Sequence, residues 1–168
     1  MNLHICEVTA KNWRSVVALD VAKDQQQFIE SNAFSLAESL YEGNGTSVGL
    51  YDGETLVGYA MYGWYSVKHK SVWLDRFMID QQYQGKGYAK RFLRLLIQFL
   101  QEKFECKIIY LSLHPDNKLA MGLYESFGFR LNGDIDDEGP VVGVVMELLI
   151  DENTSLLKQA FYYTVINF

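Results

Sequence analysis

The sequence contains only two cysteines and two prolines, and no apolar run approaches the roughly 20 residues needed to span a bilayer. Cys6 and Cys106 match no metal-binding or redox spacing, which favours a reducing compartment. Residues 1–7 alternate polar and apolar side chains, as a strand does, and do not resemble a secretory leader. We therefore predict a cytoplasmic protein with no metal.

A basic surplus is absent as well, because the formal net charge is −6 over 168 residues. This balance argues against general binding to nucleic acids, which depends on Lys and Arg contacts to phosphates. It would suit a cationic substrate, although a modest acidic excess is also the usual way for a protein to stay soluble. With 49% hydrophobic residues, the chain has the size and composition of one globular domain.

The order of periodic segments predicts an α+β, or mixed α/β, fold. Asp52-Gly53 between two strand-like runs is a strong hairpin signal, and one parallel connection around a long helix would complete a mixed sheet. We expect a domain over residues 1–150, followed at 151–168 by an extension that packs on the domain or on a partner subunit. In chain order we expect strand 3–8, helix 13–18 with Thr9 as N-cap, helix 25–41, strands 47–51, 55–64 and 72–79, helix 87–104, strand 107–113, helix 119–127 and two strands, the last at 141–149.

Residues 84–89 are the main candidate for a binding site. Gly85 and Gly87 stand where a strand must turn into a helix, and glycine there permits a positive φ and a close approach of the backbone to a ligand. A helix N-terminus favours anions, yet cations crowd this one. A phosphate-bearing ligand would remove that conflict, and the alternative is that the long side chains point into water. The cations are Lys86, Lys90, Arg91 and Arg94.

The two common nucleotide motifs do not fit this loop. A Walker loop needs four residues between its glycines and then Lys followed by Ser or Thr, which the sequence lacks. A dinucleotide fingerprint needs a third glycine where Lys90 stands. The phosphate-bearing ligand therefore has to be of another kind.

Two motifs in the sequence are Gln84-x-x-Gly87-x-Ala89 and, downstream, Asn117-x-x-Ala120 followed by Leu123-Tyr124-x-x-x-Gly128-Phe129. Together they resemble the two signatures of the GNAT superfamily of N-acetyltransferases, and the resemblance covers residues 3–149. Within that family, the run 72–80 and the last strand are most similar to bacterial spermine/spermidine acetyltransferases. The resemblance implies a central mixed, twisted sheet of about six to seven strands flanked by four helices.

The resemblance also implies acetyl-CoA as the co-substrate. In the family, the diphosphate is held by backbone N–H groups of the glycine loop, and the pantetheine arm lies against the backbone of the preceding strand. An asparagine at the position of Asn117 holds the pantetheine or neighbouring groups, although Asn117 is equally suited to be a helix N-cap. The cofactor-binding residues implied are Phe77, Met78, Ile79, Gln84, Gly85, Lys86, Gly87, Tyr88, Ala89, Lys90, Asn117 and Tyr124.

Tyr124 looks like the tyrosine that many family members place near the thioester sulfur. When an amine attacks, the CoA thiolate leaves and needs a proton, which a phenol with a pKa of about 10 can give at neutral pH. The alternative is a core tyrosine on a short helix beside Leu123 and Phe127. Neither cysteine lies in a motif, which favours direct attack in a ternary complex over an acyl-enzyme.

The attacking amine must first lose a proton, because an alkylammonium has a pKa of about 10. Asp75 stands where related polyamine enzymes carry an acidic residue, and a carboxylate can bind an ammonium and accept its proton, directly or through water. Glu30, in a segment that resembles their substrate-side helix, is a candidate for a distal ammonium. The plainer alternatives are a surface charge pair of Asp75 with Arg76 on alternating faces, and a solvated helix residue for Glu30.

The sequence therefore predicts an acetyl-CoA-dependent N-acetyltransferase for a primary amine, with a polyamine such as spermidine or spermine as the preferred acceptor. One alternative is a different amine, in an aminoglycoside, an amino acid or a protein N-terminus. Another is a CoA-binding sensor without turnover. We expect no nucleic acid or membrane partner, and a homodimer stays open. Aromatic residues could line a channel for methylenes and cations, with about half of them in the core: Tyr59, Tyr62, Trp64 and Tyr65.

Overall fold

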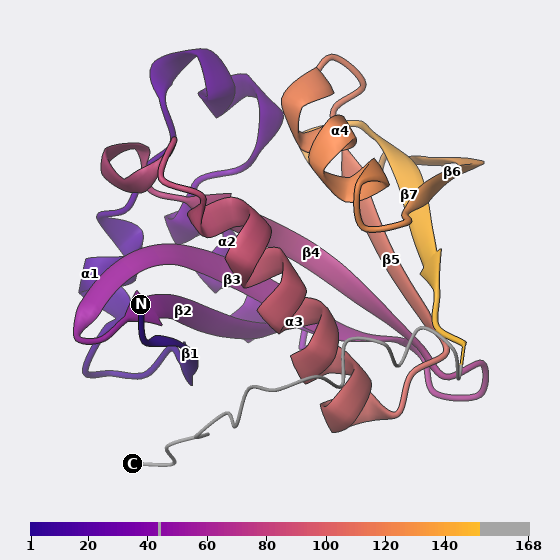
Figure 1. Ribbon diagram of the computed structural model, residues 1–168, viewed down its shortest axis with the longest axis horizontal. Coiled ribbons are helices and arrows are strands. Elements are labelled where there is room, and N and C mark those ends of the chain that lie inside the picture. Colours follow the sequence, from indigo (N-terminus) through magenta and orange to yellow (C-terminus); the bar gives the residue numbers. More distant parts are fainter. Residues whose placement is uncertain (44, 152–168) are drawn as a thin grey trace.

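A mixed sheet of seven strands forms the middle of the molecule in this computed structural model, which describes residues 1–43 and 45–151 (Figure 1). The strand order is β1-β2-β3-β4-β5-β7-β6. The strands are β1 (Leu3–Glu7), β2 (Thr46–Asp52), β3 (Thr55–Ser66), β4 (Ser71–Ile79), β5 (Ile108–Leu113), β6 (Arg130–Asp136) and β7 (Gly143–Leu149). The helices are α1 (Trp13–Val17), α2 (Asn32–Tyr41), α3 (Tyr88–Phe104) and α4 (Lys118–Glu125), with 3-10 segments η1 (Lys23–Phe28) and η2 (Gln81–Tyr83).

This architecture confirms the expected mixed α/β fold. Strands β1 to β4 pair antiparallel in sequence order, and α3 crosses over to β5, which pairs parallel to β4. The predicted hairpin is present, since Asp52 pairs with Thr55 and Gly53 has a φ of +58° between them. No helix of the described residues is long and apolar enough to cross a membrane. Nearly all of the expected extension, residues 152–168, lies outside the described residues.

Helix α3 carries the largest part of the core and lies across the front of the sheet in Figure 1. Its buried face packs against Leu74 of β4 and Leu111 of β5, among others. Burial of each such side chain stabilises the fold by about 1.5–3 kcal/mol. This packing fixes the start of α3 beside the end of β4. The most deeply buried residues of α3, at most 1% exposed, are Phe92, Leu93, Leu96, Ile97 and Leu100.

The structure corrects two predictions near the N-terminus. The helix expected over residues 25–41 is two segments, because Ile29 is extended, with φ −150° and ψ 142°, after η1. Ser31 then begins α2 as its N-cap, and its side chain accepts a hydrogen bond from the Phe34 N–H. Thr9 is not the N-cap of α1, since Asn12 precedes that helix and accepts a hydrogen bond from the Thr9 N–H.

A β-bulge interrupts β4 at Asp75. Neighbouring residues of β3 pair with Leu74 and Arg76, and Asp75 between them has no partner in the register. Leu74 and Phe77 pack on the α3 side of the sheet, whereas Arg76 contacts α2 on the other side. The extra residue therefore lets Asp75 and Arg76 share the face opposite α3, where strict alternation would separate them.

Strands β4 and β5 diverge beyond their first residues. They pair only over Ser71–Trp73 and Ile108–Tyr110, although β4 continues to Ile79 and β5 to Leu113. Within residues 1–43 and 45–151, the later part of β4 consequently has no strand neighbour on its β5 side, and a gap in the sheet opens toward the start of α3.

Candidate active site

A cavity of about 1010 Å³ lies along the divergent part of β4 and β5. Among the predicted site residues, Lys86 is the one that lies outside its lining. The fold thus brings the predicted cofactor and acceptor residues into one continuous space. Those that line it are Glu30, Asp75, Phe77, Met78, Ile79, Gln84, Gly85, Gly87, Tyr88, Ala89, Lys90, Asn117 and Tyr124.

The glycine loop before α3 has the geometry of an anion site. Gly85 and Gly87 have φ values of +73° and +80°, a region that L side chains rarely adopt, and the space beside each is open. Gly87 is the N-cap of α3 and offers no side-chain cap, and the first turn has no acidic residue. The N–H groups there are available to a phosphate, so the loop fits the diphosphate of CoA.

The side chain of Gln84 makes contacts within the protein. Its Nε2 donates hydrogen bonds of 2.9 Å to the Gln25 side-chain oxygen and to the Ile79 carbonyl oxygen. Gln25 belongs to η1, in the segment predicted to lie on the substrate side. The first residue of the motif therefore links the glycine loop to that segment.

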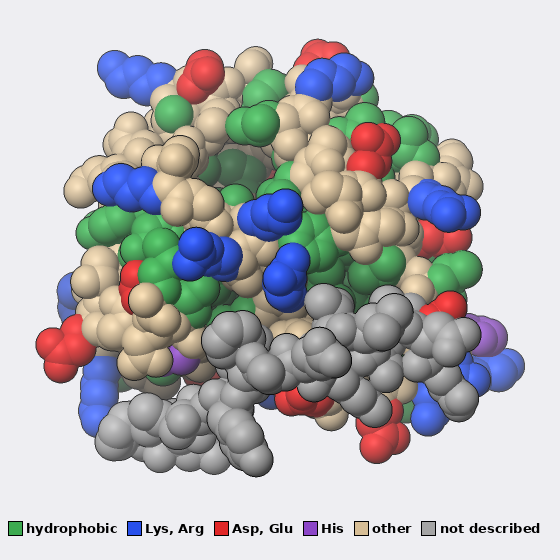
Figure 2. Space-filling model, in the orientation of Figure 1, with side chains coloured by type: hydrophobic (Ala, Val, Ile, Leu, Met, Phe, Trp, Pro, Cys, Tyr) green, Lys and Arg blue, Asp and Glu red, His purple; other side chains and the backbone are tan. Residues whose placement is uncertain are grey.

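Lys and Arg side chains gather over the first half of α3 in Figure 2. Lys90 lines the cavity, whereas Lys86 donates a hydrogen bond to the Gln82 carbonyl oxygen and lies over the Tyr83 ring. The Arg94 guanidinium lies 5.9 Å from the centre of the Phe127 ring. The cations thus surround the helix N-terminus at different depths, with Lys90 the nearest to the cavity.

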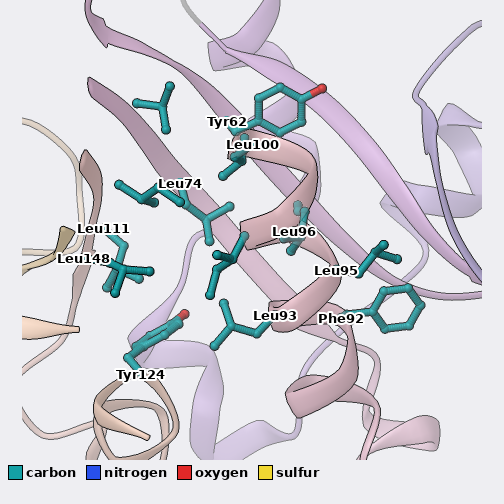
Figure 3. Close-up of a cluster of buried hydrophobic side chains, with 14 of the residues drawn as sticks. Tyr62, Leu74, Phe92, Leu93, Leu95, Leu96, Leu100, Leu111, Tyr124 and Leu148 are labelled. Carbon is teal, nitrogen blue, oxygen red and sulfur yellow. The ribbon is translucent and has the colours of Figure 1, made fainter. Parts of the chain in front are cut away.

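Asn117 and Tyr124 belong to α4 and its N-cap, and both line the cavity together with the glycine loop. Asn117 is the N-cap of α4 and accepts a hydrogen bond from the Ala120 N–H, so the N-cap alternative is correct, and it also lines the cavity. Figure 3 shows Tyr124 at the edge of the core, with its hydroxyl directed toward Leu93. Burial raises the pKa of Tyr124, so the phenol stays protonated at neutral pH. Tyr124 is both a core residue and a cavity residue.

Asp75 is a partly buried carboxylic acid in the cavity, not half of a surface charge pair. Burial is the largest cause that raises its pKa to about 7, and Arg76 opposes the rise. The negative charges of Glu38, Asp136 and Glu30 raise it further. At neutral pH, Asp75 is therefore poised to exchange a proton.

Glu30 lies between η1 and α2, so its predicted place on a helix is wrong. Its carboxylate is 3.1 Å from Arg76 Nε, and its side chain is 10% exposed, which also excludes a solvated residue. Arg76 Nη2 is 2.7 Å from Glu38 Oε2. The candidate ligand for a distal ammonium is thus paired within the protein to a guanidinium.

Most of the carboxylates of this cavity do not belong to the motifs from which the site was predicted. These carboxylates, which we call the acidic lining, share the cavity with two cations of the described residues, Arg76 and Lys90. The run at 134–138, with four acids in five residues, was the available signal. No three of the described His, Cys, Asp and Glu side chains are grouped so as to hold a metal ion. The acidic lining consists of Glu30, Glu38, Glu42, Asp75, Asp134, Asp136, Asp137 and Glu138.

The aromatic residues of β3 divide between the core and the cavity. Tyr59 and Tyr62 are fully buried core residues, and burial raises the pKa of Tyr59 to about 12. Trp64 and Tyr65 line the cavity. The Tyr65 ring contacts two further aromatic rings of the lining, Trp73 and Tyr110, which were not among the predicted channel residues.

Fold and site together are those of an acyl-CoA-dependent transferase, with a glycine loop that fits an anion on one side of a cavity and a carboxyl group of raised pKa on the other. Residues 10–129 match the acetyltransferase (GNAT) family, and the chain belongs to that family. The chain is accordingly an acetyltransferase that uses acetyl-CoA, and the predicted family and fold are confirmed.

Comparison with individual proteins adds detail to the family assignment. A spermine/spermidine N(1)-acetyltransferase of Bacillus subtilis (strain 168) is 42% identical over 149 residues, which cover 86% of this chain and 98% of that protein. The N-alpha-acetyltransferase RimI of Mycobacterium tuberculosis is 34% identical over 87 residues, 51% of this chain and 52% of that protein. A spermidine N-acetyltransferase from Vibrio cholerae, solved with CoA and spermine, has a TM-score of 0.70 at 20% identity, covering 88% of this chain and 95% of that one.

Proposed function

We propose that the protein transfers acetyl from acetyl-CoA to a primary amine of a polyamine such as spermidine or spermine. The observation that carries this proposal is the acidic lining: among the described residues, eight carboxylates, one of them the candidate proton acceptor Asp75, share the cavity with two cations. A polyamine presents several ammonium groups along a flexible chain, and such a surface attracts them. The name of the Bacillus subtilis relative supports the same acceptor.

Asp75 binds the ammonium and accepts its proton, directly or through water. An ordinary aspartate, with a pKa of 3.8, would lie about 6 pK units below an alkylammonium. The pKa of about 7 narrows that gap to about 3, which makes proton transfer easier by about 4 kcal/mol. The free amine then attacks the acetyl carbonyl within the ternary complex.

Tyr124 gives a proton to the departing sulfur. Its buried phenol is protonated at neutral pH and lies in the lining shared with Asn117 and the glycine loop. Neither Cys6 nor Cys106 lines the cavity, and burial raises the pKa of both thiols, to about 11 for Cys106. A protonated thiol is a poor nucleophile, which supports direct transfer over an acyl-enzyme.

The methylene chain of the acceptor lies against the cavity aromatics. Trp73 and Tyr110 stack at 5.8 Å between ring centroids, with Tyr65 beside both. Aromatic faces attract ammonium groups, and their apolar surface suits methylenes. We also expect the protein to act in the cytoplasm.

A panel of amines tests the acceptor, with release of the CoA thiol as the measurement. We expect turnover with spermidine and spermine and little with aminoglycosides, single amino acids or peptide N-termini. Activity on peptides alone would overturn the polyamine and would favour the chemistry named for the Mycobacterium tuberculosis relative. Acetyl-CoA binding without turnover on any amine would instead support a sensor.

A further inference from the structure

The guanidinium of Arg76 is engaged on every nitrogen by groups of the protein. Its Nε lies 3.1 Å from both Glu30 Oε2 and Ser35 Oγ, and its Nη2 lies 2.7 Å from Glu38 Oε2. Its Nη1 donates a 2.9 Å hydrogen bond to the carbonyl oxygen of Asp75. The side chain is 11% exposed. Arg76 is therefore a fixed part of the cavity lining.

The bulge in β4 is what brings this cation to the acidic lining. Without the extra residue at Asp75, the next side chain would turn to the α3 face of the sheet. With it, Arg76 reaches α2 and the segment before α2 from the same face as Asp75.

The charges of this group do not balance. Glu30 and Glu38 both bind one guanidinium, so one negative charge is left over beside Asp75. The carboxylates of Glu30 and Glu38 repel each other unless a cation lies between them. A largely buried carboxylate without a cationic partner also destabilises the folded protein. Arg76 offsets one of these two charges. With Asp75 ionised as well, the group has a net charge of −2, which two ammonium groups of a polyamine would balance.

We propose that Arg76 is a positioning residue of the reaction, which holds Glu30 and Glu38 in the acidic lining and keeps Asp75 ionised to receive the substrate ammonium. The inference rests on the proposed function, because it takes Asp75 as the proton acceptor. Arg76 acts through these carboxylates and does not contact the reacting atoms.

The charged groups that act on Asp75 come from three elements and from the segment before α2. Arg76 of β4 lowers the pKa of Asp75, whereas Glu38 of α2, Asp136 of β6 and Glu30 before α2 raise it. Removing the charge of Arg76 must therefore raise that pKa, and removing the charge of Glu38 must lower it. The two substitutions break the same ion pair but should shift the pKa of Asp75 in opposite directions. An ion pair with a merely structural role would not produce such opposite shifts.

Arg76→Gln and Glu38→Gln are compared by two measurements. The first is the NMR titration of the Asp75 carboxyl carbon in 13C-labelled protein, assigned by its loss in Asp75→Asn. The second is the acidic limb of the kcat/KM profile for spermine. We expect an upward shift of about 1 pH unit or more in Arg76→Gln and a downward shift of about 0.5 to 1 unit in Glu38→Gln, in both measurements.

Two further variants serve as controls. Arg76→Lys keeps the charge and should stay within about 0.5 unit of the unaltered protein. Lys103→Gln removes a cation that lies near Tyr62 and Glu7, outside the cavity lining, and should shift neither profile. If Arg76→Gln does not fold, as thermal denaturation would reveal, Glu38→Gln and Arg76→Lys decide the outcome.

Shifts of the same sign in the two neutral variants, or no shift in either, would overturn the inference. An NMR titration that moves as expected while the kcat/KM profile stays fixed would overturn Asp75 as proton acceptor, and with it the proposed mechanism. In that case the control of Asp75 ionisation by Arg76 would stand.

Discussion

The two sides of the cavity differ in whether backbone groups or side chains form most of the surface. The cofactor side is mostly backbone, with glycines at φ values of +73° and +80° and the open N-terminus of α3. The acceptor side is mostly side chains, with carboxylates that converge from α2, β4, β6 and the segments beside them. Backbone sites depend on conformation and charged sites depend on electrostatics. Substitutions on the two sides should therefore impair the enzyme in different ways.

The largest effect is expected at Asp75. Asp75→Asn removes the proton acceptor but keeps the shape of the side chain. General-base catalysis contributes about 10²- to 10⁴-fold, so kcat/KM for spermine should fall by that factor at pH 8. The affinity for acetyl-CoA, measured by calorimetry, should stay the same. A loss of less than about fivefold would remove Asp75 from the mechanism.

The same variant should be more stable than the unaltered protein at high pH. The pKa of Asp75 is raised from 3.8 to about 7 in the folded state, so the folded state binds more protons than the unfolded state between about pH 4 and 7. Stability therefore falls as pH rises through that window. Asp75→Asn should gain on the order of 2–4 kcal/mol in free energy of unfolding at pH 8, and nothing below about pH 4. Urea denaturation at the two pH values measures this.

The second-largest loss of activity is expected from a substitution of Tyr124, on the cofactor side. Tyr124→Phe keeps the buried ring against Phe129 and removes the phenol. We expect kcat to fall by about 10²-fold, with the affinity for acetyl-CoA nearly unchanged. Tyr62→Phe is the matched control, because Tyr62 is a fully buried tyrosine outside the cavity lining. An unchanged kcat in Tyr124→Phe would leave it a core residue only.

The difference between the two sides also determines which site residues could be predicted from the sequence. The glycine loop and α4 contain short continuous motifs, so the sequence could predict residues 84–90, Asn117 and Tyr124 as one site, and all of them except Lys86 line the cavity. The bulge at Asp75 could not be predicted, because an inserted residue changes the register with β3 but leaves the hydrophobic pattern nearly intact. The pairing of Glu30 with Arg76 could not be predicted either, because it depends on where the helical structure is interrupted before α2.

Gly87→Ala tests the backbone side directly. A non-glycine residue in the left-handed region costs about 1–2 kcal/mol. If acetyl-CoA requires that conformation, its Kd should rise by about 5- to 30-fold, with kcat at saturation little changed. Gly53→Ala imposes a similar backbone cost at φ +58° in the β2–β3 hairpin, and should leave the Kd unchanged. Equal Kd values in the two variants would mean that the loop geometry is not what binds the cofactor.

The smallest effect is expected from the exposed acids at the β6–β7 connection. Asp137→Asn and Glu138→Gln each remove one charge from the acidic lining without breaking a described hydrogen bond. Exposed pairs contribute little, so KM for spermine should rise only about two- to fivefold per substitution, and KM for acetyl-CoA should not change.

Salt distinguishes this electrostatic contribution from a change in shape. Raising the ionic strength shortens the Debye length from about 10 Å at 0.1 M to about 3 Å at 1 M, so the difference in KM should shrink toward zero. Glu54→Gln, an exposed acid on the β2–β3 hairpin outside the lining, removes the same charge and should leave KM unchanged at every salt concentration. If Glu54→Gln raises KM as much as Glu138→Gln does, the net charge of the whole protein attracts the polyamine, and the acidic lining then has no special part in binding it.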